Sequence, residues 1–324
     1  MKKIAILTSG GDAPGMNAVI SSITKYGLKS GNKVYGIEQG FEGLINDKIF
    51  NIDLKYVDNI INKAGTILKS ARSDFFKEKE GKKQAIKMLK SHNIEGLIVI
   101  GGNGSSKGAN AISSFGIPTI FIPSTIDNDV IGTEYCIGFD TAVNTVIKSI
   151  ESTKEVASSI ERIVIVEVMG RDSGDIALWS GVCSDVNYII IPEANYNVQN
   201  IIDQILNQRK NGETYSIIIV SEGASTGEEI KNIMENRMKE KIRVLVLGYL
   251  QRGSAPTAYD RMIASKMGVE AIKSLMKEER SYFLSLSNNN IKKESLTLQN
   301  NENKRLNTKD FEVAQDLSYF PLNT

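Results

Sequence analysis

The sequence predicts a doubly wound α/β fold with mainly parallel sheets. Short β-branched runs alternate with longer helical patterns along the chain, and several of these runs are apolar on both faces. Strands of that kind are typical of parallel sheets covered by helices on both sides. Hydrophobic residues make up 41% of the 324 residues, which is ample for a core. The length fits either two domains or one large α/β unit, and no Pro/Ser-rich linker marks a boundary.

The alternation can be followed in order along the chain. The expected strands are Lys3–Thr8, Lys33–Ile37, Gly96–Ile100, Thr119–Ile122, Ile163–Val168, Tyr188–Ile191, Ser216–Ser221 and Val244–Leu247. The expected helices are Met16–Lys29, Lys82–Lys90, Asp140–Ser158, Asn200–Arg209, Gly227–Lys239 and Ala258–Met276. The Asn- and Lys-rich segment Asn288–Lys304 is the most polar part, and we expect a surface connection there.

Composition excludes several classes of function. A net charge of +1 removes the usual reason to propose bulk nucleic-acid binding or an anionic membrane surface. Two cysteines exclude a Cys-rich metal site. No apolar run approaches the roughly 20 residues of a membrane span, so we expect a soluble, cytoplasmic protein. The single histidine, His92, lies at the polar end of a helical stretch, where we expect it to be solvated. Acid–base catalysis is therefore expected from a carboxylate.

Two glycine-rich loops follow apolar strands and precede helices. They are Ser9–Gly15 and Gly101–Gly108. Glycine lets a phosphate approach the backbone, and a helix N-terminus offers unpaired N–H groups. Each loop alone is equally compatible with a tight turn, but the pair favours one extended anion, such as a nucleotide polyphosphate. Neither ends in the Gly-Lys-Ser/Thr of P-loop nucleotidases, which disfavours that class.

A third motif, Pro123–Asp129, directly follows the expected strand Thr119–Ile122. Asp127 and Asp129 lie two residues apart, so one carboxylate can accept a proton from a hydroxyl while the other holds Mg²⁺. The alternative is an Asx-rich turn whose side chains bond only to local backbone. Spacing alone does not decide between them.

Arginines occur in apolar or glycine-rich contexts that suit bidentate binding of phosphate, although each one alone is better explained by a surface or structural salt bridge. They are Arg72, Arg162, Arg171, Arg243 and Arg252. Glu222 ends the strand Ser216–Ser221, where it can bind sugar hydroxyls or cap the next turn.

Taken together, these motifs resemble those of bacterial ATP-dependent 6-phosphofructokinases, in the same order and at essentially the same spacing. The resemblance runs from Met1 to about Phe320. It rests on Leu7–Asp12, Gly101–Ser105, Thr125–Asp129, Val168–Arg171, Ser221–Gly223 and Leu250–Gly253. It implies transfer of a phosphoryl group from MgATP to the 1-hydroxyl of fructose 6-phosphate, giving fructose 1,6-bisphosphate and ADP in glycolysis.

The resemblance also implies an architecture. Two doubly wound domains would hold the active site in the cleft between them, and four copies would form a homotetramer with active sites shared between subunits. Residues 1–138 and 251–304 would bind the nucleotide. Residues 139–250 and 305–324 would bind the sugar phosphate.

Roles carry over by position. Asp127 would be the base, Arg72 and Arg171 would neutralise the transferring group, and Asp129 and Asn103 would serve the magnesium. ATP would contact Gly11, Arg72, Ser73, Gly102, Asn103, Gly104 and Ser105. The sugar phosphate would contact Thr125, Asp127, Arg162, Met169, Gly170, Arg171, Glu222, Arg243, Tyr249 and Arg252. Of these, Arg162 and Arg243 would come from a neighbouring subunit.

Departures from the family pattern leave alternatives open. The family usually has Asp at position 103 and His at 249, where this chain has Asn103 and Tyr249. Asn103 favours an attenuated paralogue that binds sugar phosphate or partner subunits. A pyrophosphate-dependent enzyme would carry Asp at 104 and Lys at 124, where Gly104 and Ser124 stand. Positions that bind an effector in regulated members correspond to Ser21, Lys25, Leu54, Lys154, Asn187, Asn211 and Glu213.

Overall fold

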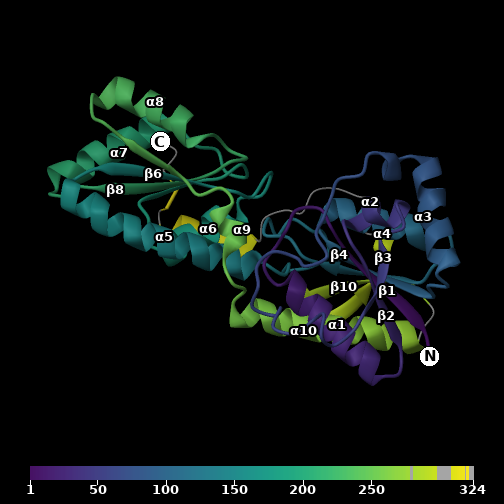
Figure 1. Ribbon diagram of the computed structural model, residues 1–324. Coiled ribbons are helices and arrows are strands. Elements are labelled where there is room, and N and C mark those ends of the chain that lie inside the picture. Colours follow the sequence, from purple (N-terminus) through teal and green to yellow (C-terminus); the bar gives the residue numbers. More distant parts are fainter. Residues whose placement is uncertain (278–279, 298–307, 318, 321–324) are drawn as a thin grey trace. The chain divides into compact units, whose positions relative to one another are not determined.

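The computed structural model describes residues 1–277, 280–297, 308–317, 319 and 320. The chain divides into two compact units, each with its own sheet. The first unit comprises Met1–Thr141 and Arg252–Lys304, and the second comprises Ala142–Gln251 and Arg305–Thr324. Helices flank a mainly parallel sheet in each unit (Figure 1), which confirms the predicted fold class. None of the described helices is long and apolar enough to cross a membrane.

Within the described residues, the sheet of the first unit has the strand order β11-β10-β5-β4-β1-β2-β3. All neighbouring pairs are parallel except β2–β3 and β10–β11, which are antiparallel. The strands are β1 (Lys3–Ser9), β2 (Lys33–Ile37), β3 (Ile49–Ile52), β4 (Gly96–Gly101), β5 (Thr119–Pro123), β10 (Tyr282–Ser287) and β11 (Asn290–Glu294).

Helices cover both faces of this sheet (Figure 1). Ala5 and Leu7 of β1 pack into the apolar cluster under α2, α3 and α4, whereas the alternate residues Ile4 and Ile6 are buried outside it, on the face that α1 and α10 cover. Burial on both faces explains the unbroken apolar pattern of the central strands. The helices are α1 (Met16–Lys29), α2 (Gly40–Ile45), α3 (Lys79–Ser91), α4 (Asn103–Ser113) and α10 (Ala258–Lys277), with a 3₁₀ turn η1 (Phe75–Lys77).

The direction of winding reverses between β1 and β4. From β1 the chain runs outward to β2 and β3, then returns to the other side of β1 to build β4 and β5. In open α/β sheets, ligands bind outside the carboxyl ends of the strands at such a switch point. The two glycine-rich loops follow these two strands, so the topology places them at this position.

The second unit has the strand order β7-β8-β6-β9 among its described residues, with all pairs parallel. One apolar cluster joins α7 and α8 to β6 and β8. The strands are β6 (Ile163–Val168), β7 (Tyr188–Ile190), β8 (Ser216–Ser221) and β9 (Arg243–Val246). The helices are α6 (Asp175–Cys183), α7 (Val198–Lys210), α8 (Gly227–Met238) and α11 (Thr308–Asp316), while α5 (Phe139–Ile160) and α9 (Leu250–Gly253) begin in one unit and end in the other.

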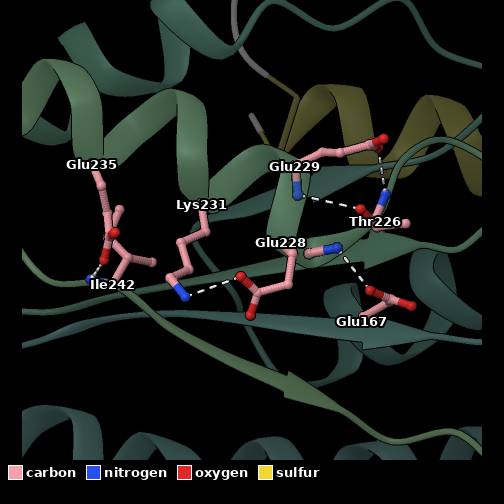
Figure 2. A network of polar contacts seen from close by, with 8 residues as sticks. Glu167, Thr226, Glu228, Glu229, Lys231, Glu235 and Ile242 are labelled. Carbon is pink, nitrogen blue, oxygen red and sulfur yellow. Dashed lines mark hydrogen bonds and ion pairs between the residues drawn. The ribbon is translucent and has the colours of Figure 1, made fainter.

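The start of α8 is fixed by a capping box (Figure 2). The Thr226 side chain accepts a hydrogen bond from the backbone N–H of Glu229 at 3.2 Å, and the Glu229 carboxylate accepts one from the backbone N–H of Thr226 at 3.2 Å. Glu167 of β6 accepts a further bond from the N–H of Gly227 at 2.7 Å. Because the first N–H groups of a helix lack partners within it, these contacts define where α8 begins.

Two expectations need correction. Asn290–Glu294 is not a surface connection but β11, paired with β10 through the register Leu286↔Ile291. Polar residues and lysines suit an edge strand because they discourage pairing with other chains. Residues 298–304 of the same segment lie outside the described residues. His92 does end a helix, but its Nε2 lies 2.6 Å from Asp47 Oδ1 and the side chain is only partly exposed.

Candidate active site

The loops after β1, β4 and β5 lie at one edge of the first sheet, because these strands are parallel neighbours. Ser105 joins the two glycine-rich loops, since a Cβ built on Gly10 would lie 3.3 Å from Ser105 Oγ. A Cβ on Gly102 would lie 3.5 Å from the Thr125 side chain, which links the second glycine-rich loop to the third motif. The structure therefore brings Gly102, Ser105 and Thr125 together at this edge.

Arg252 lies over the first glycine-rich loop. Its Nη1 donates a hydrogen bond to the backbone oxygen of Asp12 at 3.0 Å. Its guanidinium lies so close to Gly11 that a side chain at that position would clash with it. Burial raises the pKa of Asp12, while hydrogen bonds from the Thr66 and Ala13 backbones and the charge of Arg252 lower it. Arg252 and Gly11 thus share one location, although the resemblance assigned them to different substrates.

Asn17 holds the segment that carries Arg72, and the sequence reasoning did not identify it. This fully buried side chain on α1 donates to the backbone oxygens of Lys63 at 3.0 Å and Gly65 at 2.7 Å, and it accepts from Ile67 N at 2.9 Å. Its only signal in the sequence is an amide on an apolar helix face. A hydrogen bond from Ser70 to the Gly10 oxygen brings the same segment to the first loop.

Arg72 itself is exposed, and the hydroxyl of Ser73 accepts a bond from Phe76 N at the start of η1. The predicted residues Arg72 and Ser73 therefore stand on a segment attached to the carboxyl edge of the sheet.

The loop after β5 places its two aspartates differently. Asp127 is only 1% exposed, and its backbone N–H donates to Thr125 Oγ1 at 3.3 Å, whereas Asp129 is half-buried. Asn128 between them adopts a left-handed conformation with φ of 50°, which asparagine tolerates. Its side chain accepts from Cys136 N at 3.0 Å and donates to Glu134 O at 3.3 Å. Asn128 is a further positioning residue that the sequence reasoning missed.

Asn103, the first residue of α4, contacts Asp129 directly. Its Nδ2 lies 2.9 Å from Asp129 Oδ2 and 3.1 Å from the Asp129 backbone oxygen. In the described part of the chain, no group of three or more His, Cys, Asp or Glu side chains is arranged to hold a metal.

In the second unit, Met169–Arg171 follows β6 and Glu222 follows its neighbour β8. Glu222 Oε1 accepts from the N–H of Arg171 at 2.9 Å and of Gly170 at 3.2 Å. These bonds hold a turn in which Arg171 has a φ of 52°. Glu222 thus holds the turn at Gly170 and Arg171 through its backbone, and the turn presents the exposed Arg171.

Two predicted residues lie at the opposite edge of this sheet. Arg162 precedes β6, and Arg243 begins β9, whereas Arg171 and Glu222 follow the other ends of their strands. At about 3.3 Å per residue, the six residues of β6 separate the two edges by roughly 20 Å. Within the second unit, Arg162 and Arg243 therefore lie far from Arg171 and Glu222. Tyr249 follows β9 and is 83% exposed.

Glycine-rich loops at a switch point, a carboxylate loop beside them and arginines at strand ends are typical of α/β proteins that bind phosphorylated ligands. The comparisons with known proteins define the family. The family model described as Phosphofructokinase matches residues 3–275. The chain is 45% identical over 323 residues to the ATP-dependent 6-phosphofructokinase of Clostridium tetani, covering 98% of this chain and 100% of that protein. This chain belongs to the phosphofructokinase family.

Further relatives agree. The ATP-dependent 6-phosphofructokinase of Listeria welshimeri is 44% identical over 318 residues, which cover 98% of this chain and all of that protein. A solved structure of Pichia pastoris phosphofructokinase in the T-state matches with a TM-score of 0.88 and 31% identity, over 98% of this chain and 37% of that longer chain. A pyrophosphate-dependent phosphofructokinase from Marinobacter aquaeolei matches with a TM-score of 0.87 over 95% of this chain and 86% of that one. At 21% identity, it supports the fold alone.

Proposed function

We propose that this protein is an ATP-dependent 6-phosphofructokinase that converts fructose 6-phosphate and ATP to fructose 1,6-bisphosphate and ADP in cytoplasmic glycolysis. The observation that carries the proposal is the convergence of three loops at adjacent strand ends, where the loop of the third motif contacts the second glycine-rich loop through Thr125 and Asp129. Relatives between 42% and 45% identical over nearly the whole chain carry this name.

Asp127 is the base in this proposal. It accepts the proton of the sugar 1-hydroxyl, the resulting oxygen attacks the γ-phosphorus of ATP, and the bond to the ADP oxygen breaks. Such transfer depends on positioning and charge neutralisation more than on covalent chemistry. Arg72 and Arg171 are exposed cations suited to neutralise the transferring group. A carboxylate base also agrees with the position of His92, which is paired with Asp47 at the end of α3.

The nucleotide is proposed to bind at Gly11 and at Gly102–Ser105, where the N-terminus of α4 favours negative charge. Ser105 carries a buried hydroxyl with no hydrogen-bond partner among the described residues, which a bound ligand would satisfy. Gly104 supports ATP over pyrophosphate, because no atom lies within 4 Å of a Cβ built there. Ser124 adds no charge at the position where pyrophosphate users are expected to carry lysine.

Asp129 is proposed to hold the magnesium ion, which would neutralise charge on the ATP phosphates when bound. Asn103 lies beside it. The half-buried Asp129 carboxylate suits a hard cation that prefers oxygen ligands.

The sugar phosphate is proposed to bind across two copies of the chain. Thr125, Met169, Gly170, Arg171 and Glu222 would hold the sugar, and Tyr249 and Arg252 would hold its 6-phosphate. The placement of Arg162 and Arg243 at the far edge of their sheet supports their supply by a second copy. The homotetramer expected from the resemblance provides such copies. In this proposal the first unit binds the nucleotide and the second unit binds the sugar phosphate.

An assay of the purified protein with fructose 6-phosphate tests the proposal. Formation of fructose 1,6-bisphosphate is measured with MgATP and separately with magnesium pyrophosphate. We expect turnover with ATP to exceed turnover with pyrophosphate. Faster turnover with pyrophosphate would show that pyrophosphate, and not ATP, is the phosphoryl donor.

Asn103 favours a second candidate, the attenuated paralogue. Binding of fructose 6-phosphate measured by calorimetry, together with no turnover from either donor, would support that function instead.

A further inference from the structure

Asn103 and Asp129 are 26 residues apart in sequence and meet at the carboxyl edge of the first sheet. The Asn103 side-chain nitrogen contacts two oxygens of Asp129, one in the carboxylate and one in the backbone. Both are acceptors only, so the side-chain atom that faces them must be the NH₂ group, which is a donor. The orientation of this amide thus follows from the chemistry of its partners.

We infer that Asn103 is a positioning residue that holds Asp129 from within the protein, through hydrogen bonds that a carboxylate at position 103 cannot make. The inference rests on the proposed function, since that proposal assigns Asp129 to magnesium. It revises the expectation that Asn103 and Asp129 serve the cation alike. The amide nitrogen of Asn103 faces Asp129. Of these two residues, only Asp129 supplies a negative charge to the cation.

An aspartate at position 103 would behave in the opposite way. Its oxygens would face the two Asp129 oxygens, and carboxylates at such a distance repel each other unless a cation lies between them. With Asn103, the loop is fixed by the protein before any cation arrives. The single charge of Asp129 also attracts free Mg²⁺ less than a pair of carboxylates would, so the ion arrives mainly with the phosphates of the nucleotide.

The neighbouring residues of the loop are held by contacts of their own. Asn128 is bonded to the backbone at Glu134 and Cys136, and Thr125 packs against Gly102. The Asn103 bond reaches Asp129 from α4, an element that follows a different strand. It therefore couples the nucleotide-binding helix to the catalytic loop.

Thermal unfolding of the full-length protein without nucleotide tests the inference. Wild type, Asn103→Asp and Asn103→Ala are compared in a chelator and in millimolar MgCl₂. We expect Asn103→Asp to lower the unfolding temperature in chelator by about 3 °C or more and MgCl₂ to restore it. Asn103→Ala removes the bonds without adding charge, so its smaller loss should not respond to MgCl₂. Wild type should respond weakly.

A matched control exists at the end of α2. Asn46 donates to the carboxylate of Glu42 at 2.8 Å, in an exposed position. Asn46→Asp makes the same change of charge beside a carboxylate outside the candidate site. We expect little loss of stability, no recovery with MgCl₂ and wild-type activity.

Steady-state kinetics separate positioning from a merely structural role. Asn103→Ala should lower kcat about tenfold while the KM for fructose 6-phosphate stays within about twofold, because the bond orients the catalytic loop and does not bind sugar. A rise in the KM for fructose 6-phosphate with kcat unchanged would contradict this.

The inference is overturned if Asn103→Asp loses no more stability in chelator than Asn46→Asp, or if wild type gains as much from MgCl₂ as Asn103→Asp. It fails separately from the proposed function. A wild-type protein that does not phosphorylate fructose 6-phosphate would contradict the proposed function, while the unfolding temperatures would still decide the role of Asn103.

Discussion

Asp127 is the residue on which the proposed chemistry depends most. Its side chain is buried at the carboxyl edge of the first sheet, and its backbone is fixed by Thr125. Replacing it with serine removes the proton acceptor and keeps a small polar side chain. We expect Asp127→Ser to lower kcat by about 10²–10⁴-fold, with the KM for fructose 6-phosphate little changed.

Steady-state kinetics check this prediction, with Asp203→Ser on the exposed surface of α7 as the control. The control should keep wild-type kcat. A folded Asp127→Ser protein that loses less than about tenfold in kcat would show that another group accepts the proton.

Gly104 allows a test of donor recognition without a steric change. No atom lies within 4 Å of a Cβ built at this position, so alanine and aspartate both fit. We expect Gly104→Asp to raise the KM for ATP about tenfold or more, because a carboxylate at the start of α4 repels phosphate. Gly104→Ala should bind ATP as wild type does. Equal losses in both variants would indicate that glycine itself is required.

Single residues also show how far the sequence reasoning reached. The spacing of Asp127 and Asp129 and their place after a strand were visible in the sequence, and the structure puts them at the expected edge. The contact between Asn103 and Asp129 and the bonds from Glu222 to the turn at Gly170 were not visible. These contacts join residues that are 26 and 52 positions apart in the sequence, so they form only when tertiary packing brings the residues together.

At the scale of elements, the capping box of α8 makes a local contribution to stability. Thr226→Ala removes the acceptor for Glu229 N, which then loses its partner at the start of the helix. We expect the free energy of unfolding to fall by about 1 kcal/mol with catalytic activity unchanged. Urea unfolding followed by circular dichroism measures the loss.

Ser152→Ala is the matched control. Ser152 lies on the exposed face of α5, and its hydroxyl bonds only to the Lys148 oxygen of the same helix. Because alanine favours helix interiors, this variant should unfold at wild-type stability or slightly above it. An equal loss in both variants would mean that the cap contributes nothing beyond an ordinary surface hydroxyl.

The predicted elements differ in accuracy for a physical reason. β2, β6 and β8 begin and end where the sequence placed them. In β6 and β8 nearly every position is buried, and a short run of β-branched apolar residues is typical of such a central strand. β3, β10 and β11 were not predicted. β3 and β11 are short edge strands with exposed positions, and neither has the apolar run that marks a central strand. β10 is largely buried, but Ser285 and Ser287 interrupt its apolar pattern. The polar composition of Asn290–Glu294 suggested a surface connection, but these residues form an edge strand of the sheet.

At the scale of the whole molecule, the shared active site predicts complementation between inactive subunits. Asp127→Ser removes the base, and Arg243→Ala removes a proposed phosphate contact supplied by the neighbour. If both groups of a site come from different chains, a mixture of the two variants contains some intact sites. Random assembly from equal amounts should restore about a quarter of wild-type activity.

The variants are unfolded together, refolded and assayed, with each variant refolded alone as the control. Activity equal to the mean of the two separate variants would place all these residues in one chain. Arg162→Ala should complement Asp127→Ser in the same way.

The response to effectors is a second property of the whole molecule. Lys154 Nζ donates a hydrogen bond to the backbone oxygen of Asp185 at 2.6 Å, and Asn187 Oδ1 accepts one from Ile217 N at 2.7 Å. Both side chains therefore bond to the backbone of their own unit. Each charged contact to a phosphorylated effector is worth about 1.5–3 kcal/mol, and Ser21, Leu54 and Asn211 carry no charge to provide it. We expect ADP and phosphoenolpyruvate to shift half-saturation by fructose 6-phosphate less than about twofold. A larger shift would require another effector site.

The discontinuous first unit has a consequence for how the protein is made. β5 needs β10 as its neighbour, through the pairs Ile120↔Tyr282 and Phe121↔Phe283, and α1 packs on α10. The sheet of the second unit is encoded entirely between these segments. On the ribosome, the 162 positions from Phe121 to Phe283 take roughly 8–32 s at roughly 5–20 residues per second. During that interval the edge of β5 and the apolar side of α1 are uncovered in the nascent chain, so synthesis at high temperature should depend on chaperones that shield them until α10 and β10 emerge.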